Sequence, residues 1–367
     1  MEKIKESLDK LVKRKNLTRK ESFSAFKDLI NGKYGKLNDI YLGSFLASMQ
    51  AKNPTKEEIA GLMDVVLKYD RVPLRVTKAE RFCGIVGSGR DTIKTINIST
   101  AAAIIASGLG VKVVKNGCRS ESSVSGTTDV LEELGVNVHA KSKDMIKSLE
   151  ENNIGFFDAE PYFPKMFNKY VGKFPFINPL SYALSVASAV EFKRMIFGLS
   201  SPDTEFTASI LKEMGFKFAL VVQGSDEKAI NHIDELSTLG KTKISELKNG
   251  RIKTYFLYPK EIGLINGKYR EIAQHKTNQE NSLHLVKVLL GKSNRGSIEI
   301  VALNAGALLY ISGKEKTLKA GVDKSLRYIY SGEAIKQIKK LVITSRGDIK
   351  KLNKYIEIAS EDNGKNN

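Results

Sequence analysis

Cysteine is scarce in this chain, and long apolar runs are absent. Only two cysteines occur among 367 residues, without the spacing of a metal site, so a disulfide framework or zinc ribbon is excluded and a reducing cytoplasm is expected. The longest apolar stretch, residues 298–311, carries Glu299 and Asn304 and is too short to span a membrane, so we expect a buried helix there. Residues 1–16 are charged and lack an apolar core, so no signal peptide is expected.

Acidic residues are too few to balance the basic ones. The chain has 59 lysines and arginines against 41 acids, which gives a net charge of +18. Such a surplus attracts polyanions, so nucleic acid is one partner to consider. However, basic residues run from Lys3 to Lys365, interleaved with acids, and no RNP-type motif, helix-turn-helix signature or arginine-rich arm is present. The charge therefore favours anionic small substrates or a generally basic proteome, with nucleic acid as the alternative.

Two capping boxes organise the first part of the chain. Residues 18–21 and 55–58 each place a threonine three positions before a glutamate, and apolar residues recur at helical spacing after them. This pattern predicts an N-terminal helical domain over residues 1–70. Its apolar stripes must be buried, either against a larger domain or at the surface of a homodimer.

From residue 80 the pattern changes to short apolar runs that alternate with helical segments. We predict strands at residues 82–86, 111–114, 136–139, 154–157, 218–222 and 251–258. Helices are predicted from Ser201-Pro202 to Gly215, at 281–290 and at 298–311. The expected fold class is α/β, in which residues 71–359 form a mostly parallel sheet flanked by helices.

Two segments fall outside this alternation. Residues 160–195 hold four of the eight prolines and many aromatic residues, which predicts an irregular segment that packs on the helical domain and forms the wall of a binding cleft. Residues 360–367 are polar and are expected to be a disordered tail.

Residues 84–100 carry the clearest functional pattern. An apolar strand ends at a glycine turn, residues 87–91, and Ser99-Thr100 opens an alanine-rich helix. Glycine lets the backbone approach a phosphate closely, and the amides and dipole of a helix start favour negative charge. This stretch therefore predicts an anion-binding site.

Two further stretches complete that site. Residues 115–129 follow a predicted strand and offer Lys115 and Arg119 with several hydroxyl groups, which suits a second part of a phosphate-rich site. Asp234 and Glu235 are adjacent carboxylates beyond another strand, and oxygen ligands of this kind suit a divalent ion that rides on phosphates.

In order and spacing these motifs resemble those of the anthranilate phosphoribosyltransferase family of glycosyltransferases, which also includes pyrimidine nucleoside phosphorylases. Family members carry a Gly-Thr-Gly-Gly-Asp turn, a Thr-Phe-Asn-Ile-Ser-Thr stretch, a Lys-His-Gly-Asn-Arg block and an Asp-Glu pair. Residues 87–91, 95–100, 115–119 and 234–235 match them in the same order.

The resemblance implies an enzyme that transfers the 5-phosphoribosyl group of phosphoribosyl pyrophosphate (PRPP) to the nitrogen of an aromatic acceptor, with Mg²⁺ as its cofactor. Ser99, Asp234 and Glu235 are implied to place the metal, and Lys115 and Arg90 are candidates for electrostatic catalysis at the leaving pyrophosphate. The residues implied to bind PRPP are Gly87, Ser88, Gly89, Arg90, Asp91, Thr95, Asn97, Ile98, Ser99, Thr100, Lys115, Ser122, Ser123 and Thr127.

The acceptor side departs from the family pattern. Asn116 and Cys118 stand where the family has His and Asn, Phe163 replaces a His, and Lys173 falls at the position of an Arg. With Gly117 these residues would form the acceptor pocket, and lysine does not reproduce the planar fork that arginine offers a carboxylate. We therefore expect a working PRPP site with an altered acceptor pocket. The alternatives are a relative that binds nucleic acid without catalysis and a nucleoside phosphorylase, which would need a Lys-His-Ser loop and an additional C-terminal domain.

Overall fold

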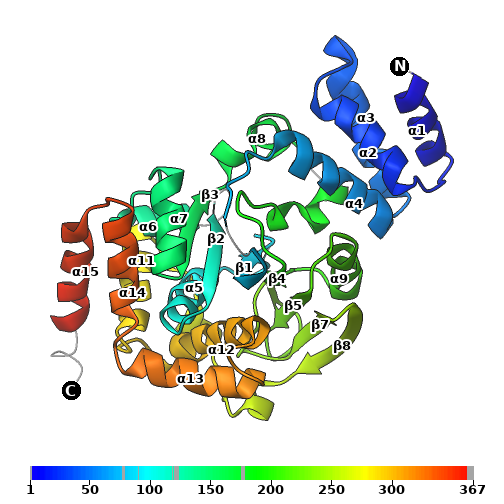
Figure 1. Cartoon of the computed structure of the whole chain (residues 1–367). Helices are drawn as coiled ribbons and strands as arrows, with labels where there is room; N and C mark the ends of the chain where they lie inside the picture. The colour runs from blue at the N-terminus through cyan, green and yellow to red at the C-terminus, as the bar shows by residue number, and fades with distance from the viewer. Residues whose placement is uncertain are drawn as a thin grey trace. The chain divides into compact units, whose positions relative to one another are not determined.

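The computed structural model describes residues 2–76, 79–89, 91–117, 119, 124–174 and 178–361. The chain divides into two compact units (Figure 1). Three segments form the first unit: Met1–Pro73, Ala159–Ala189 and Glu205–Phe216. The remaining segments, Leu74–Asp158, Val190–Thr204 and Lys217–Asn367, form the second.

The first unit begins with four helices: α1 (Glu2–Val12), α2 (Arg19–Ile30), α3 (Asn38–Ala51) and α4 (Lys56–Val65). Both predicted capping boxes are confirmed, because Thr18 accepts from the amide of Glu21 and Thr55 from that of Glu58, each at 3.2 Å. Helix α2 packs on α4, and α1 packs on α3. A π-helical turn, Val66–Asp70, extends α4.

Within the first unit, residues 160–174 and 178–189 of the proline-rich segment contain short helical turns: Glu160–Tyr162, α8 (Pro164–Lys169), Pro179–Tyr182 and Leu184–Val186. Residues 190–195 of the predicted segment belong to the second unit, where Arg194 begins strand β4 (Arg194–Gly198). Buried Asp70 accepts hydrogen bonds from the amides of Lys165 (2.7 Å) and Met166 (2.8 Å), which caps the start of α8. The predicted helix start at Ser201-Pro202 is wrong. Helix α9 (Thr204–Glu213) begins later, and the carbonyl of Pro202 instead accepts from Lys243 Nζ at 2.7 Å.

The second unit is built on a sheet with the strand order β3-β2-β1-β4-β5-β7-β8. Neighbours from β3 to β5 run parallel, whereas β7 and β8 are antiparallel and β6 pairs with β5. The predicted mostly parallel sheet is confirmed. The strands are β1 (Phe82–Gly87), β2 (Lys112–Gly117), β3 (Ile154–Asp158), β4 (Arg194–Gly198), β5 (Phe218–Ser225), β6 (His232–Ile233), β7 (Thr242–Lys248) and β8 (Arg251–Leu257).

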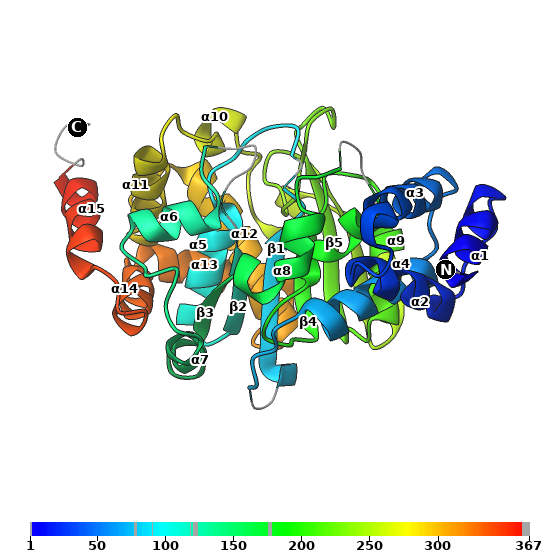
Figure 2. The ribbon, with the colours of Figure 1, turned by 90° about the horizontal axis from the view of Figure 1, so that it is seen from above.

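Helices cover this sheet. The predicted buried helix is confirmed as α12, which packs on β1, β4, β5 and α5, whereas α7 packs on β2 and β3. Figure 2 shows α11, α14 and α15 close together at the end of the unit that carries α6. The helices are α5 (Ile98–Gly108), α6 (Thr127–Glu133), α7 (Ser142–Glu151), α10 (Tyr269–Ile272), α11 (Asn278–Leu289), α12 (Arg295–Ser312), α13 (Leu318–Tyr330), α14 (Ile335–Thr344) and α15 (Ile349–Glu361). Of the expected tail, Ser360 and Glu361 end α15, and residues 362–367 lie outside the described residues.

The predicted strand at residues 136–139 is wrong. These residues form a turn, because the amide of Asn137 donates to Ser345 Oγ (3.1 Å) and the carbonyl of Gly135 accepts from the amide of Asp348 (2.7 Å). The sheet also contains two strands that were not predicted: β4 lies between β1 and β5, and β7 lies between β5 and β8. None of the helices that the structure describes has the length and apolarity that a membrane crossing needs.

Candidate active site

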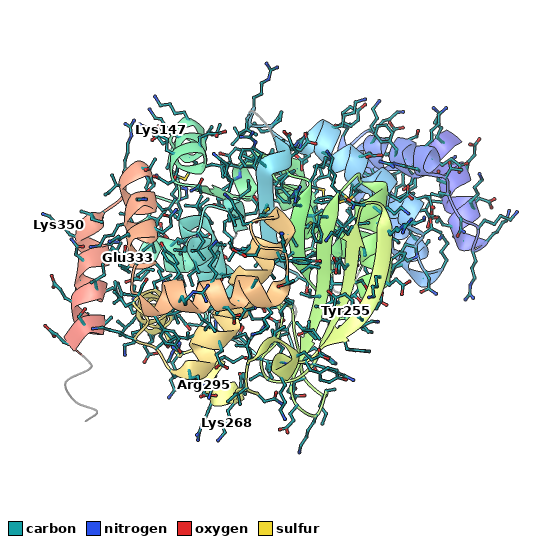
Figure 3. All side chains as sticks on the ribbon, turned by 60° about the horizontal axis from the view of Figure 1, so that its bottom comes forward. Lys147, Tyr255, Lys268, Arg295, Glu333 and Lys350 are labelled. Atoms are coloured by element: carbon teal, nitrogen blue, oxygen red, sulfur yellow. The ribbon has the colours of Figure 1, made fainter. Side chains whose placement is uncertain are left out.

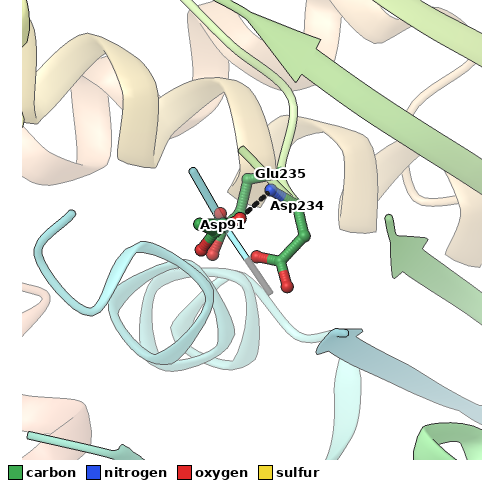
Figure 4. A group of neighbouring side chains, drawn as sticks. All are labelled: Asp91, Asp234 and Glu235. Carbon is green, nitrogen blue, oxygen red and sulfur yellow. Dashed lines mark hydrogen bonds between the residues drawn. The ribbon is translucent and has the colours of Figure 1, made fainter. Parts of the chain in front are cut away.

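Three carboxylates meet at the carboxyl ends of the parallel strands. Asp91, Asp234 and Glu235 each offer an oxygen, and these oxygens lie within 4.8 Å of one another (Figure 4). Asp234 and Glu235 are buried, and Asp91 is partly buried. The Asp-Glu pair singled out in the sequence is therefore joined by Asp91, which the family resemblance places among the PRPP-binding residues.

Glycines make room for the Asp234-Glu235 turn. A Cβ atom on Gly87 of β1 would lie 2.4 Å from the carboxylate of Asp234, and one on Gly198 of β4 would lie 1.4 Å from the carbonyl oxygen of Asp234. A Cβ on Gly224 of β5 would lie 2.5 Å from the carbonyl oxygen of Glu235. Any side chain at these positions would displace the turn, so three strand ends together determine where the carboxylates lie.

The turn after β1 is bonded directly to Asp234. Its carboxylate accepts from the amide of Gly89 at 2.6 Å and from the hydroxyl of Ser88 at 3.3 Å. The amide of Asp234 donates to Asp91 Oδ1 at 2.6 Å (Figure 4). Gly89 has a φ of +72°, which glycine adopts without strain. The glycine turn predicted to bind an anion thus also holds one of the acids.

The three carboxylates repel one another, and the nearby lysines only partly compensate this repulsion. Burial, followed by the charge of Asp234, raises the pKa of Asp91 to about 8. Burial, followed by the charges of Asp234 and Asp91, raises the pKa of Glu235 well above its usual value, while Lys115 acts in the opposite direction. Glu235 Oε2 is buried and has no hydrogen-bond partner among the described residues. A hard cation with oxygen ligands, such as Mg²⁺, fits this donor set.

The start of α5 carries polar groups and a lysine that could hold an anion beside the acids. Asn97 precedes the helix without capping it, its Nδ2 donates to the carbonyl of Ser125 at 3.4 Å, and its Oδ1 is buried without a partner among the described residues. Buried Lys115 donates to Ser99 Oγ (3.4 Å) and to the carbonyl of Ile85 (3.3 Å). A cation at a helix start is a common arrangement for binding phosphate.

Residues 124–129, the described end of the predicted block at 115–129, lie next to the start of α5. Thr127 Oγ1 lies 3.2 Å from Thr100 Oγ1, which brings the start of α6 to the start of α5. Ile98 is fully buried, so its side chain belongs to the core. Four of the predicted residues, Arg90, Cys118, Ser122 and Ser123, lie outside the described residues.

The predicted acceptor residues fall in different units. Asn116 and Gly117 end β2 in the second unit, where a Cβ on Gly117 would meet the ring of Phe156 at 2.5 Å. Phe163, which is buried, and Lys173 belong to the first unit.

A segment that the sequence did not point to supports both of the loops that are predicted to bind phosphate. Residues 271–275 pair with residues 94–96, since Ile96 donates to the carbonyl of Ile272 (2.9 Å) and Gln274 to that of Lys94 (3.1 Å). The side chain of Gln274 also accepts from the amide of Val124 at 3.2 Å. Only the three-dimensional pairing identifies this brace, because nothing in its sequence resembles a motif.

The brace is tied to α11 and α12 by two histidines. His275 Nε2 lies 2.7 Å from His284 Nδ1, and His284 Nε2 lies 2.8 Å from Ser297 Oγ. Burial, followed by the nearby His275, lowers the pKa of His284 to about 4. The folded protein therefore holds His284 neutral under conditions in which the unfolded chain binds a proton.

Acid is expected to destabilise the fold through His284. The free energy of unfolding that is linked to neutral His284 is at its maximum above pH 6.5, the pKa of histidine in the unfolded chain. It falls by up to about 3 kcal/mol as the pH drops towards about 4, the pKa of His284 in the folded protein. Urea unfolding of wild type and His284→Gln at about pH 7 and about pH 5 measures it. The wild type should lose more stability than the variant over this interval, and equal losses would contradict the assignment.

Comparisons with known proteins identify the family of this chain. Residues 79–335 match the α/β domain of a glycosyl transferase family, and residues 5–69 match the helical bundle domain of the same family. The chain belongs to this family. The predicted relationship to anthranilate phosphoribosyltransferases is confirmed by the relatives.

Two curated relatives are anthranilate phosphoribosyltransferases. The protein of Methanosphaera stadtmanae is 31% identical over 353 residues, which cover 92% of this chain and 98% of the relative. The protein of Geobacillus thermodenitrificans is 32% identical over 347 residues, with 92% and 97% covered. The crystal structure of the Thermus thermophilus enzyme matches with a TM-score of 0.83 at 28% identity, covering 93% of this chain and 99% of that one. A Saccharomyces cerevisiae enzyme in complex with PRPP and Mg shares the fold, with a TM-score of 0.76 at 24% identity and coverage of 94% and 98%.

Proposed function

We propose that this protein transfers the 5-phosphoribosyl group of PRPP to the nitrogen of an aromatic acceptor and releases pyrophosphate, with Mg²⁺ as its cofactor. The observation that carries the proposal is the group of three carboxylates, with a buried, unpartnered oxygen on Glu235, beside a helix start that faces Lys115. A magnesium pyrophosphate needs both features, since it combines a cation with an anion.

The side chains divide this work. Asp91, Asp234 and Glu235 would hold Mg²⁺, which when bound neutralises charge on the leaving pyrophosphate. Lys115 and the start of α5 offer positive charge and donors to phosphate oxygens. Negative charge develops on the pyrophosphate as its bond to the anomeric carbon breaks, so donors fixed in advance lower the barrier electrostatically.

The acceptor is proposed to differ from anthranilate. This proposal rests on Asn116, Cys118, Phe163 and Lys173, which depart from the family pattern. Efficient PRPP-dependent turnover of anthranilate in a steady-state assay would contradict it, without affecting the proposed PRPP site.

A cytoplasmic homodimer is proposed as the working form. Val12 on α1 and Ile40 on α3 are 72% and 62% exposed, and these apolar side chains suit a contact between copies. Sedimentation velocity tests the association, and a monomer at micromolar concentration would exclude it.

The alternative of nucleic-acid binding rests on the net charge of +18. In Figure 3 the labelled Lys147 and Lys350 lie away from Lys268 and Arg295, which lie near each other. Along the sequence, basic residues run from Lys3 to Lys365 and are interleaved with acids, which favours a small anionic ligand over a continuous polyanion that binds best to clustered charge. The nucleoside phosphorylase alternative has no observation in its favour.

Calorimetric titration with PRPP tests the proposed function. Binding is expected with Mg²⁺ and is expected to weaken by about tenfold or more when the metal is chelated, because the acids then repel the pyrophosphate. Absence of PRPP binding in the presence of Mg²⁺ would refute the transferase proposal. Strong, salt-sensitive binding to duplex DNA in its place would support the nucleic-acid alternative.

A further inference from the structure

Asn304 lies in the middle of α12 and is completely buried. Its Oδ1 accepts from the amide of Leu236 at 3.1 Å, and its Nδ2 donates to the carbonyl of Leu236 at 2.9 Å. The same Nδ2 also donates to the carbonyl of Ile300 within the helix, at 2.9 Å. One side-chain amide therefore binds both backbone groups of a single residue and ties that residue to α12.

Leu236 directly follows the Asp234-Glu235 pair. Two strand ends already pack against the two acids, because Gly198 of β4 contacts the backbone of Asp234 and Gly224 of β5 contacts the backbone of Glu235. The next residue, Ser237, is bonded separately, since its amide donates to Thr242 Oγ1 at 2.9 Å. Between these contacts, Asn304 provides the hydrogen bonds that fix the backbone immediately after Glu235.

We infer that Asn304 is a positioning residue that sets the orientation of Asp234 and Glu235 for a divalent cation. This inference rests on the proposed function, because it assigns the metal to these acids. Residues that orient metal ligands act on metal affinity, and their loss typically weakens it by about 10- to 100-fold. A purely structural role would lower stability and leave the metal affinity of the folded protein unchanged.

The test is a calorimetric titration of PRPP at a series of Mg²⁺ concentrations. Asn304→Leu keeps the branched shape of the side chain and removes the tether to Leu236, so the Mg²⁺ concentration for half-maximal PRPP binding should rise by about tenfold or more. At saturating Mg²⁺ its PRPP affinity should fall by less than about threefold, because the residue touches no phosphate-binding group.

A conservative variant and a matched control complete the design. Asn304→Asp, whose buried carboxyl is held protonated, keeps one donor and one acceptor and should shift the midpoint less than the leucine variant. It also tests the inference if the leucine variant does not fold. Leu308→Ala, on the same buried helix, should lower the melting temperature and leave the Mg²⁺ midpoint unchanged.

The outcomes separate the two proposals. If the wild type binds PRPP with a Mg²⁺ midpoint and the folded Asn304 variants keep that midpoint, the positioning role is refuted and the proposed function stands. If the wild type shows no Mg²⁺-dependent PRPP binding, the proposed function fails and the inference fails with it.

Discussion

Glu235→Gln is expected to lower PRPP-dependent turnover by about 100-fold or more while it raises the stability of the metal-free protein. Glutamine keeps the shape of the side chain and removes its negative charge. The pKa of Glu235 is raised by burial and by the charges of Asp234 and Asp91, so its ionised form strains the metal-free fold and neutralising it relieves the repulsion. Activity and stability should therefore move in opposite directions, as is common at functional sites.

Steady-state kinetics and thermal unfolding in EDTA measure the two effects. Glu299→Gln is the matched control, because Glu299 is also buried but pairs with Arg295 at 2.6 Å. That variant should lose stability and keep its activity. Unchanged turnover in Glu235→Gln would contradict the assignment of this carboxylate to the metal, and a lower melting temperature would contradict the electrostatic account.

Lys115→Met is expected to lower kcat/KM for PRPP by about 100-fold and to destabilise the metal-free protein by about 3 kcal/mol. Lys115 is buried, its Nζ lies near the start of α5, and its charge lowers the pKa of Glu235. Methionine fills a similar space without the charge, so the carboxylates lose a compensating cation. Kinetics at varied PRPP and urea unfolding measure both consequences.

Lys112→Met is the control for this change. Lys112 begins the same strand and pairs with Glu150 at 2.9 Å near the surface, where an ion pair contributes about 1 kcal/mol or less. Its loss should leave kcat/KM near the wild-type value. Equal effects of the two lysine variants would show that β2 is merely sensitive to substitution.

The two large effects are expected to be coupled. In the Lys115→Met/Glu235→Gln double variant both the cation and the carboxylate that it compensates are absent. Its free energy of unfolding should therefore be higher, by about 1 kcal/mol or more, than the value obtained by adding the changes of the two single variants. Strict additivity in urea unfolding would mean that Lys115 and Glu235 do not interact through charge.

Much of the fold could be predicted because the signals for it are local. A capping box acts between residues three apart, and both predicted boxes form at α2 and α4. Predicted strands at residues 82–86, 154–157 and 218–222 correspond to β1, β3 and β5, since each is an apolar run bounded by turn residues.

The errors arose where tertiary contacts compete with local preference. Residues 136–139 have the composition of a strand, but the amide of Asn137 donates to Ser345 Oγ, and the neighbouring carbonyl of Gly135 accepts from the amide of Asp348. Strand β7 has an alternating, charged sequence and forms because it pairs with β5 and β8 on either side. Such pairing depends on neighbours in the sheet, which local propensity does not report.

The site was predicted in pieces. The glycine turn, the Ser99-Thr100 helix start, Lys115 and the Asp234-Glu235 pair were each visible as motifs. Three features were not visible as motifs: the place of Asp91 in the acidic cluster, the brace at residues 271–275 and the hydrogen bonds from Asn304. These three depend on contacts between residues far apart in the chain.

The sequence alone determined which groups this protein offers to a substrate: amides at a glycine turn and a helix start, a lysine and an acidic pair. Only the tertiary structure decided how they combine. The order β1-β4-β5 brings Gly87, Gly198 and Gly224 to one edge of the sheet, and the turn that carries Asp234 and Glu235 fits there because no side chain occupies those positions. The physical reason is close packing, because a Cβ atom added at any of these three glycines would overlap atoms of Asp234 or Glu235.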